Sequence, residues 1–327
     1  MTAAPTTRVI AASEDTAREA ARCLAAGGLV AFPTETVYGL GADATDGVAV
    51  ARLYQAKGRP AFNPLIAHVP DLAAAQRLAR FSAAALRLAQ AFWPGPLTLV
   101  LPKAQSCDVA DLALAGLDSI AVRVPDHDVA RNILSAFGKP IVAPSANRSG
   151  HVSPTTAQHV LGDLRGRIDL IVDGGATPVG VESTIVACLE RPALLRPGGL
   201  PRDAIERLLG HPLAEAQIDA EDAPLAPGML ASHYAPRARL RLDARDLRPG
   251  EALLAFGPPL PGNAGATRNL SEAANLIEAA ANLFSHLRAL DAAGATAIAV
   301  MPVPNDGLGE AINDRLRRAA APRTNGL

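Results

Sequence analysis

The sequence predicts an α/β fold in two domains. Through the first two-thirds of the chain, short apolar runs typical of buried strands alternate with segments of helical periodicity, the pattern of a mixed sheet flanked by helices. A stretch rich in Pro, Ala and acidic residues, 211–236, has no clear period and the composition of a linker. After it the alternation returns on a smaller scale, and 327 residues exceed what one hydrophobic core usually organises. We therefore predict a larger domain over residues 1–210, the linker, and a smaller domain over residues 237–327.

Capping residues and apolar runs define the elements of the larger domain. Ser13 is suited to cap a helix over 13–26 that Gly27 and Gly28 end, and Asp46 is suited to cap a helix that runs to Ala56. Further helices are expected at 71–80, 82–92, 127–137, 155–165 and 201–209. Strands are expected at 29–32, 65–69, 97–101, 120–124, 141–143, 168–172 and 184–189.

The smaller domain is predicted from five segments. Apolar runs at 238–242, 251–256 and 296–301 predict strands, and helical periodicity covers 271–293 and 308–320. Strands and helices that alternate in this order are typical of a small Rossmann-like domain with a parallel sheet.

Composition and charge narrow the class of protein. A chain that is 49% hydrophobic and 19% charged suits compact globular material. A formal net charge of -1 lacks the basic excess of a protein that holds nucleic acid over a broad surface, although a local basic cleft is compatible with it. No signal-peptide pattern begins the chain, and no apolar segment approaches membrane-spanning length. We expect a cytoplasmic protein without membrane attachment.

Several standard signatures are absent. Cys23, Cys107 and Cys188 stand far apart without a CxxC pair, so neither a disulfide framework nor a zinc site is predicted. The sequence also contains no GxxxxGK(S/T), no GxGxxG after a strand, no HExxH and no GxSxG. A nucleotide, if bound, must be held by another arrangement.

Six polar segments stand at or near the predicted strand ends. They are 33–41 (PTETVYGLG), 57–60 (KGRP) with Asn63-Pro64, His68, Arg123, 144–150 (PSANRSG), and 180–184 (GVEST) with 195–198 (LRPG). Hydroxyls and glycines in the first segment suit a small polar ligand, but a plain strand-to-helix turn capped by Asp46 is the alternative. Lys57 and Arg59 can hold a phosphate or carboxylate together, or simply end a solvated helix.

Two charged or titratable residues lie inside apolar strands. A lone histidine such as His68 is more often structural than catalytic. Arg123 must face solvent or meet a buried anion, because an unpaired buried charge is costly. Arginines, a lysine and hydroxyls at the exits of several strands together predict an anionic ligand with hydrogen-bonding groups, since ligands gather at strand ends in open α/β sheets. The residues by themselves therefore indicate a nucleotide or carboxylate site.

In this order, the segments strongly resemble the threonylcarbamoyl-adenylate synthase family, in its two-domain form with a YrdC-like catalytic domain. The matching motifs are PTETVYGLG at 33–41, KGRP at 57–60, NPL at 63–65, WPGPLT at 93–98, AVRVP at 121–125, APSAN at 143–147, VESTI at 181–185, LLRPG at 194–198, APGMLASHYAP at 226–236 and GLGEAINDRL at 307–316. The resemblance thus covers nearly the whole chain. It implies a twisted open sheet with flanking helices around a concave, positively charged cleft.

The resemblance also implies a reaction. The amine of L-threonine and bicarbonate form a carbamate, which attacks the α-phosphate of ATP and expels pyrophosphate, giving threonylcarbamoyl-AMP for the threonylcarbamoyladenosine (t6A) modification of tRNA. The protein must then supply positive charge, alignment and exclusion of water, and neither an acyl-enzyme nor a Ser/His/Asp triad is expected. A tRNA threonylcarbamoyl transferase is the implied recipient of the product, with no direct binding of nucleic acid by this chain.

The family's site residues carry over onto this sequence. The implied threonine contacts are Thr36, His68, Arg123, Ser183 and the backbone at Ala143. The implied ATP contacts are Arg59, Asn63, Ser119, Ser145, Asn147, Val152, Arg196 and Tyr234. Lys57 and Arg59 are the implied catalytic pair, which with Arg196 and Mg²⁺ would offset the charge that develops on pyrophosphate. Glu35 could orient groups nearby but receives no firm role. The segment 232–236 is expected to fold over the cleft as a lid, and the alternative is a tether packed on the surface, in which Tyr234 only covers apolar area.

Two other functions are compatible with such a cleft. A concave basic surface could bind double-stranded RNA in RNA or ribosome maturation, but near-neutral charge and the scarcity of aromatic residues for base stacking count against it. Carbamoyl transfer onto another protein is the second alternative, because a related domain occurs in hydrogenase-maturation proteins. That form normally has extra domains that this sequence does not contain.

Overall fold

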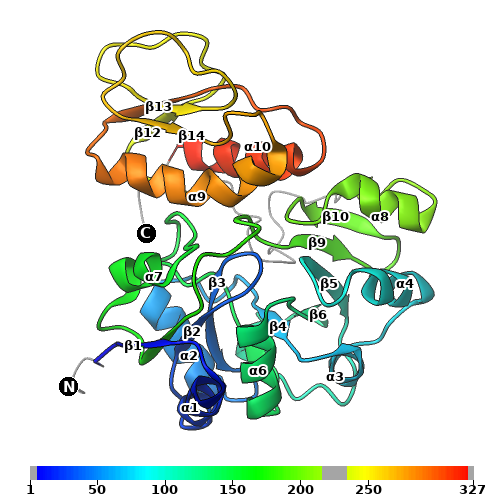
Figure 1. Cartoon of the computed structure of the whole chain (residues 1–327). Coiled ribbons are helices and arrows are strands. Elements are labelled where there is room, and N and C mark those ends of the chain that lie inside the picture. Colours follow the sequence, from blue (N-terminus) through cyan, green and yellow to red (C-terminus); the bar gives the residue numbers. More distant parts are fainter. Residues whose placement is uncertain (1–5, 216–233, 323–327) are drawn as a thin grey trace.

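The computed structural model describes residues 6–215 and 234–322. Within them, the chain forms a large mixed sheet and a small parallel sheet, each with flanking helices (Figure 1). The predicted α/β fold is therefore confirmed. Most of the expected linker, including Ser232 and His233 of the expected lid, lies outside the described residues.

The large sheet has 11 strands in the order β1-β8-β2-β3-β7-β4-β6-β5-β9-β10-β11. Parallel pairs such as β4–β6 and antiparallel pairs such as β2–β3 both occur, which makes the sheet mixed. The strands are β1 (Arg8–Ala11), β2 (Val30–Pro33), β3 (Tyr38–Asp43), β4 (Ile66–His68), β5 (Leu97–Pro102), β6 (Ser119–Arg123), β7 (Ile141–Val142), β8 (Leu170–Asp173), β9 (Thr184–Ala187), β10 (Ala193–Arg196) and β11 (Ala214–Glu215).

Helices cover both faces of this sheet because alternate strand residues point to opposite sides. They are α1 (Glu14–Ala25), α2 (Gly47–Lys57), α3 (Leu72–Leu78), α4 (Ala83–Phe92), α5 (Asp111–Leu114), α6 (Asp128–Phe137), α7 (Ala157–Leu164) and α8 (Arg202–Leu209). Ala31 and Leu40 belong to a core with α2, α3, α4, α7 and α8, whereas Val30 and Phe32 pack against α1 and α6. Each fully buried Leu or Phe contributes about 1.5–3 kcal/mol to these cores.

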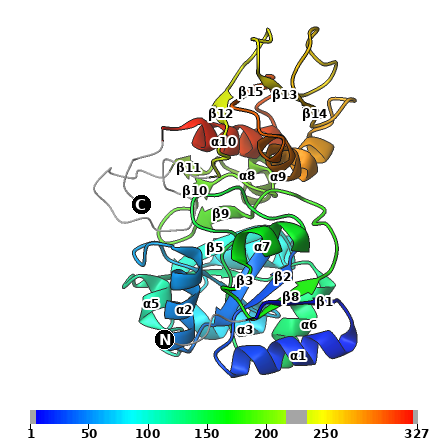
Figure 2. The same ribbon diagram turned by 90° about the vertical axis from the view of Figure 1, so that its left-hand side faces the viewer.

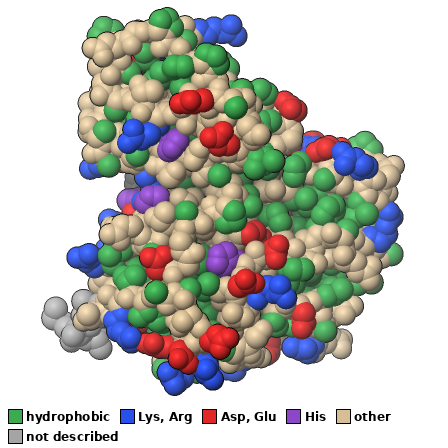
Figure 3. Space-filling view, viewed as in Figure 1, with side chains coloured by type: hydrophobic (Ala, Val, Ile, Leu, Met, Phe, Trp, Pro, Cys, Tyr) green, Lys and Arg blue, Asp and Glu red, His purple; other side chains and the backbone are tan. Residues whose placement is uncertain are grey.

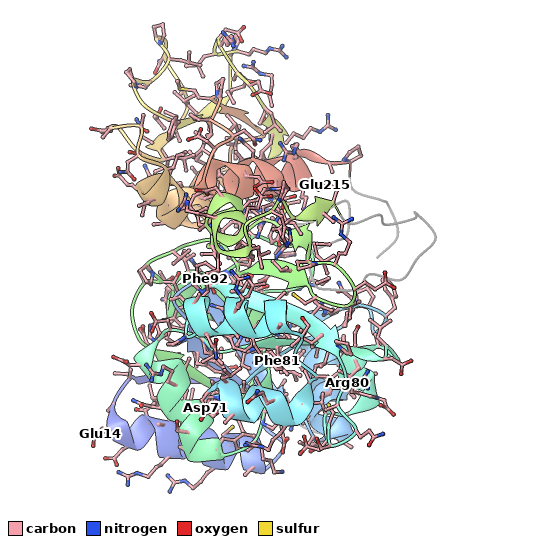
Figure 4. All side chains as sticks on the ribbon, turned by 90° about the vertical axis from the view of Figure 1, so that its right-hand side faces the viewer. Glu14, Asp71, Arg80, Phe81, Phe92 and Glu215 are labelled. Carbon is pink, nitrogen blue, oxygen red and sulfur yellow. The ribbon has the colours of Figure 1, made fainter. Side chains whose placement is uncertain are left out.

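The predicted caps begin the helices. Ser13 accepts a hydrogen bond from the backbone of Thr16, and Asp46 accepts one from Val48. Asp71 and Ser82 cap α3 and α4 in the same way, and Figure 4 labels Asp71 at the start of α3 and Phe92 at the end of α4. Such caps satisfy amide donors that the first helical turn leaves open, which is why the boundaries predicted from them lie within a few residues of those observed.

The segment 33–41 differs from the sequence expectation. It begins at the end of β2, as expected, but it is not a strand-to-helix turn, because residues 34–37 lead into the antiparallel strand β3. Gly41 lies so close to β2 that a Cβ at this position would stand 2.7 Å from the ring of Phe32. The glycines that suggested a turn therefore permit close packing within a strand. The strands β1, β10 and β11 were also missed.

The C-terminal part is a four-stranded parallel sheet, as its strand and helix order predicts. Its strands are β12 (Arg239–Arg241), β13 (Ala252–Ala255), β14 (Thr267–Asn269) and β15 (Ala297–Val300), in the order β12-β15-β13-β14. The helices α9 (Leu276–Ala292) and α10 (Leu308–Ala320) lie between this sheet and the larger domain (Figures 1 and 2). The expected helix over 271–293 is shorter, and β14 was not predicted.

The two parts share a hydrophobic core. Val37, Val152 and Val181 of the larger domain lie in one buried cluster with Leu283 and Phe284 of α9. Ion pairs add to this contact at its edges: Arg288 with Asp163 and Arg202 with Glu310. Arg202 also pairs with Glu215, which Figure 4 labels beside the C-terminal part. Because α9 and α10 pack against the larger domain, their residues can reach the site described next.

One further property concerns membranes. Within 6–215 and 234–322, no helix has both the length and the apolar character that a bilayer crossing requires.

Candidate active site

The helices α1 and α6 cover one face of the large sheet over β2, β7 and β8. The site lies on the same face, beside these helices, over β4 and β6. In β4, Ala67 points into the main core, so its neighbours Ile66 and His68 point to the opposite face. The parallel register pairs His68 with Arg123 of β6, which places both side chains next to each other on that face. Alternation within two apolar strands thus delivers a histidine and an arginine to one pocket.

The pocket gathers nine of the residues carried over from the family, from segments far apart in the chain. They are Thr36, Arg59, His68, Arg123, Ala143, Ser145, Ser183, Arg196 and Tyr234. Its lining also includes Val37, Ile66, Pro144 and Glu182, which the sequence analysis did not select. The cavity has a volume of only about 40 Å³, and the Tyr234 side chain that helps to line it is 1% exposed. All of the lining residues except Ser145 are buried.

Arg123 meets a buried anion, one of the two options that the sequence left open. Its guanidinium lies 2.6 Å from Oε1 of Glu35, and both side chains are almost fully buried. Arg123 also donates to the backbone carbonyl of Gly95 from Nε. These two contacts orient the guanidinium, and Arg123 still lines the pocket, where it can bind a carboxylate. Glu35, which sequence reasoning left without a firm role, is therefore the ion-pair partner that orients Arg123.

His68 is uncharged in this site. Burial, together with the positive charge of Arg123, lowers the pKa of His68 from 6.5 to about 3. Its Nδ1 lies 3.1 Å from the carbonyl of Ile66, which fixes the ring. A neutral imidazole offers a hydrogen bond to a polar ligand without adding a second positive charge beside Arg123.

Hydroxyl groups line the pocket on two sides. Oγ1 of Thr36 lies 2.8 Å from Oγ1 of Thr34 in the turn between β2 and β3. Oγ of Ser183 lies 2.7 Å from Oγ1 of Thr98 on β5. These buried pairs hold two hydroxyls in fixed positions for a ligand that carries its own hydroxyl or amino group.

Two further arginines supply positive charge. Arg59 donates to the carbonyls of Asn63 and Pro64, and Arg196 donates to the carbonyl and hydroxyl of Ser183. Burial, with a smaller contribution from the nearby charge of Arg196, lowers the pKa of Arg59 from 12.5 to about 10. Arg59 is buried, with only 8% of its surface exposed. Among the described residues it nevertheless makes no ion pair. A buried cation with only neutral partners is costly, so the pocket is built for an anion.

Five of the carried-over residues do not line the pocket. Lys57 is buried and donates from Nζ to the carbonyls of Ser145 and Asn147, so it supports the segment that follows β7. Burial and the charge of Arg59 hold the pKa of Lys57 well below its usual range. Direct contact of Lys57 with phosphate stays a prediction.

The other four are distributed around the pocket. The side-chain oxygens of Asn63 and Asn147 are buried and find no hydrogen-bond partner among the described residues. Because such a group costs about 1–3 kcal/mol, both are suited to accept from a bound ligand. Val152 packs in the shared core between the domains. Ser119 begins β6, at the opposite end of that strand from Arg123, so its assignment to ATP stays a prediction.

The buried histidine predicts acid lability. The folded pKa of His68, about 3, is below its unfolded value of about 6.5, so the unfolded state binds the proton first as pH falls. Stability is then fully present above pH 6.5 and declines toward pH 3, by up to about 1.4 kcal/mol per pH unit for this one group. We expect His68→Gln to reduce that slope by about 1 kcal/mol per pH unit in urea unfolding between pH 4 and 6. His211→Gln, at an exposed position, is the matched control. An unchanged slope in His68→Gln would contradict the prediction.

Fold and site together define the chain as an α/β protein with an enclosed, cationic pocket for a small anionic substrate, as in enzymes of nucleotide chemistry. A family profile described as "Telomere recombination" (Sua5_yciO_yrdC) matches residues 22–198, and one described as "Threonylcarbamoyl-AMP synthase, C-terminal domain" matches residues 200–321. The chain therefore belongs to the two-domain threonylcarbamoyl-AMP synthase family, as the sequence motifs predict.

Known relatives agree with this membership. The chain is similar to threonylcarbamoyl-AMP synthase of Pyrococcus abyssi (44% identity, covering 94% of each chain) and of Bacillus subtilis (40% identity, covering 93% of each chain). Its fold is similar to the crystal structure of P. abyssi Sua5 complexed with L-threonine, with a TM-score of 0.88 and 40% identity over 96% of this chain and 97% of that one.

Proposed function

We propose that this protein forms threonylcarbamoyl-AMP and pyrophosphate from L-threonine, bicarbonate and ATP, for the t6A modification of tRNA. The observation that carries the proposal is the pocket itself, where a carboxylate-binding arginine, Arg123, lies with two buried cations, Arg59 and Arg196. The amino acid carries a carboxylate and the triphosphate is anionic, so one site whose cations can bind both groups matches this reaction. Membership of the threonylcarbamoyl-AMP synthase family supports the same conclusion.

Threonine is proposed to bind through Arg123 and the surrounding hydroxyls. Arg123 pairs with the substrate carboxylate while Glu35 keeps the guanidinium oriented. Thr36 and Ser183 hydrogen-bond the polar groups of the amino acid, with the neutral His68 and the backbone of Ala143 beside them. The substrate methyl group requires an apolar wall, which Ile66 offers.

ATP is proposed to bind on the side of Arg59 and Arg196. These two cations contact the phosphates, and the free side-chain oxygens of Asn63 and Asn147 accept from donors on the nucleotide. Ser145 and Tyr234 line the same pocket, and Ser119 and Val152 complete the proposed set. Lys57 acts on this site at least through its two bonds to the 145–147 backbone.

The chemistry that follows needs alignment and charge rather than a covalent intermediate. Bicarbonate and the threonine amine give a carbamate and water. A carbamate oxygen then forms a bond to the α-phosphorus of ATP, while the bond between the α-phosphorus and the leaving pyrophosphate oxygen breaks. Arg59 and Arg196 stabilise the charge that develops on pyrophosphate. Enclosure of the pocket keeps water from the carbamate and the adenylate, both of which hydrolyse readily.

Mg²⁺ is proposed to arrive with ATP as part of the substrate. Within the described ranges, no group of three His, Cys, Asp or Glu side chains could hold a metal ion. Glu35 and Glu182, the two carboxylates at the pocket, are each paired with an arginine. The donor set therefore does not fit a protein-held metal, and the triphosphate is the ligand that remains for Mg²⁺.

The setting of the reaction is also part of the proposal. Threonylcarbamoyl-AMP would pass to a tRNA threonylcarbamoyl transferase, and the chain would act in the cytoplasm without binding nucleic acid itself. The double-stranded RNA alternative has less support, because acidic and basic side chains are intermixed over the face that Figure 3 shows and the candidate site is a small buried pocket.

Pyrophosphate release from ATP, with threonine and bicarbonate each omitted in turn, tests the function. We expect release to require both, and serine to replace threonine with a specificity constant kcat/KM lower by about 10- to 200-fold, because one missing methyl group in a fitted pocket costs about 1–3 kcal/mol. Pyrophosphate release at the full rate without any amino acid would show that the pocket has been assigned to the wrong substrate.

A further inference from the structure

A buried arginine of the C-terminal part reaches the wall of the pocket. Arg315 lies on α10 and is 0% exposed, yet it makes contacts far from its own helix. Its Nε donates to Oε2 of Glu182 at 2.8 Å, and its Nη1 donates to the carbonyl of Pro197 at 2.9 Å. Asp314 accepts a second bond from Nη1 at 2.7 Å. One side chain of α10 is thus bonded to two separate loops of the larger domain.

Both loops carry proposed substrate contacts. Glu182 lines the pocket and directly precedes Ser183, while Pro197 directly follows Arg196. Glu182 is also bonded to the hydroxyl of Ser153 through Oε1, so both of its oxygens are held. Arg196 donates to the carbonyl of Ser183, which joins the two loops to each other. A displacement of Arg315 would therefore shift a threonine contact and an ATP contact together.

The ion pair between Arg315 and Glu182 orients these side chains more than it stabilises the fold. Burial raises the pKa of Glu182, but Arg315 and Arg196 outweigh it and hold that pKa below its ordinary value, so the carboxylate is charged at neutral pH. Docking of the domains does not depend on this pair alone, because apolar side chains and the Arg288–Asp163 and Arg202–Glu310 pairs also hold them. Buried ion pairs add little stability compared with apolar packing, so orientation is the more informative role.

The guanidinium of Arg315 also packs on the ring of Tyr234. The guanidinium carbon of Arg315 lies 5.3 Å from the centre of the Tyr234 ring, and Phe284 of α9 stacks on that ring with centroids 5.5 Å apart. Tyr234 in turn lines the pocket. Residues of α9 and α10 therefore hold Tyr234 in its position at the pocket.

We propose that Arg315 is a positioning residue of the active site, acting through Glu182 and Pro197 to align Ser183 and Arg196 with the substrates. The C-terminal part then supplies part of the catalytic geometry rather than only stability. This inference rests on the proposed function for its kinetic consequence, and on the contacts of Arg315 for its structural one.

Arg315→Lys in the full chain tests the proposal. Lysine keeps the charge but cannot donate to Glu182 and Pro197 in two fixed directions, as the arginine fork does. We expect kcat for threonine-dependent pyrophosphate release to fall by about 10- to 100-fold, because misalignment far from the reacting atoms costs up to about 100-fold. Most of the loss should appear in kcat rather than in KM, since the contacting side chains remain present.

Glu310→Gln is the matched control on the same helix. It removes the Arg202–Glu310 ion pair, which also joins α10 to the larger domain but lies away from the pocket. We expect its kcat to equal that of the wild type, and melting temperatures of the two variants to be similar. Equal kcat in Arg315→Lys and Glu310→Gln would overturn the proposal.

Two more measurements make the result decisive if Arg315→Lys is unstable or the reaction differs. Glu182→Gln and the double variant form a cycle: action through Glu182 predicts that the two losses in kcat are far from additive, and additive losses refute it. Hydrogen exchange is independent of activity. The amides of Thr184 and Gly199, bonded to the carbonyls of Pro96 and Glu182, should exchange faster in Arg315→Lys than in Glu310→Gln.

The two hypotheses fail in different ways. A wild-type chain without threonine-dependent pyrophosphate release refutes the proposed function, whereas the exchange comparison still decides whether Arg315 positions the two loops. Unchanged exchange at Thr184 and Gly199, together with unchanged kcat, refutes the role of Arg315 in an enzyme whose function is otherwise as proposed.

Discussion

Replacing Arg59 by alanine is expected to lower turnover in threonylcarbamoyl-AMP synthesis by about 100-fold or more, because one preorganised charge contact is lost at the reacting centre. Arg59 is buried, has the uncharged Tyr54 and backbone carbonyls as partners and makes no ion pair among the described residues, so we expect its charge to serve a ligand rather than the fold. Steady-state pyrophosphate release at saturating ATP measures the effect. Removing an uncompensated buried cation should leave the melting temperature unchanged or raise it.

Lys57→Ala is expected to lower turnover to a similar degree, but partly by a different route. Its ammonium holds the carbonyls of Ser145 and Asn147, so the variant should also lose stability, which Arg59→Ala should not. Lys103→Ala is the matched control, since Lys103 is partly exposed and pairs with the exposed Asp111. Near-wild-type turnover in both Arg59→Ala and Lys57→Ala at saturating ATP would move the nucleotide site elsewhere.

Local signals in the sequence predicted much of the fold. Ser13 and Asp46 cap the helices that they were expected to cap, because the capping bond is made within three residues. Apolar runs identified β4 and β6, and the unusual residues inside them, His68 and Arg123, marked the pocket. These features depend on neighbours in the chain, which is why one sequence suffices to find them.

Features that depend on distant contacts were not found. Glu182 was quoted only as part of a motif, and its partner Arg315 lies 133 residues away in another motif, on the helix predicted over 308–320. Glu35 was recognised as near the site, but its ion pair with Arg123 needs the register of the folded sheet. The strand β3 was hidden by two glycines: Gly41 packs tightly against Phe32 of β2 and Gly39 faces Ala143, contacts that exist only in the folded sheet. Pairings between distant segments set these properties.

Tyr234 gives the last prediction, because the structure changes the meaning of the expected lid. The sequence suggested a segment, 232–236, that folds over the cleft, with surface packing of Tyr234 as the alternative. Tyr234 lines the pocket and is 1% exposed, and its φ of 63° is a left-handed conformation that a bulky residue rarely adopts. Such backbone costs about 1–3 kcal/mol and persists only where the surroundings hold it, here Phe284 and Arg315.

We expect Tyr234→Ala in the full chain to lower the yield of threonylcarbamoyl-AMP by about 10-fold or more, since the pocket would open to water and its unstable intermediate would hydrolyse. Product analysis should show free threonine and AMP rising relative to the adenylate. Tyr234→Phe is the matched control: it keeps the ring that covers the pocket and stacks on Phe284, and it should keep most of the yield.

A chain that ends after residue 215 extends the same test. It keeps β11 paired with β10, but it loses Tyr234 and Arg315 together and exposes Val37 and Val152. We expect synthesis to fall by about 100-fold or more, because the side chain that covers the pocket, Tyr234, and the side chain that aligns its loops, Arg315, are removed together. Comparison with Tyr234→Ala separates the causes. If Tyr234→Ala makes threonylcarbamoyl-AMP at the full rate and yield while the shortened chain does not, closure by Tyr234 is refuted, and the contribution of the C-terminal part lies in the alignment by Arg315.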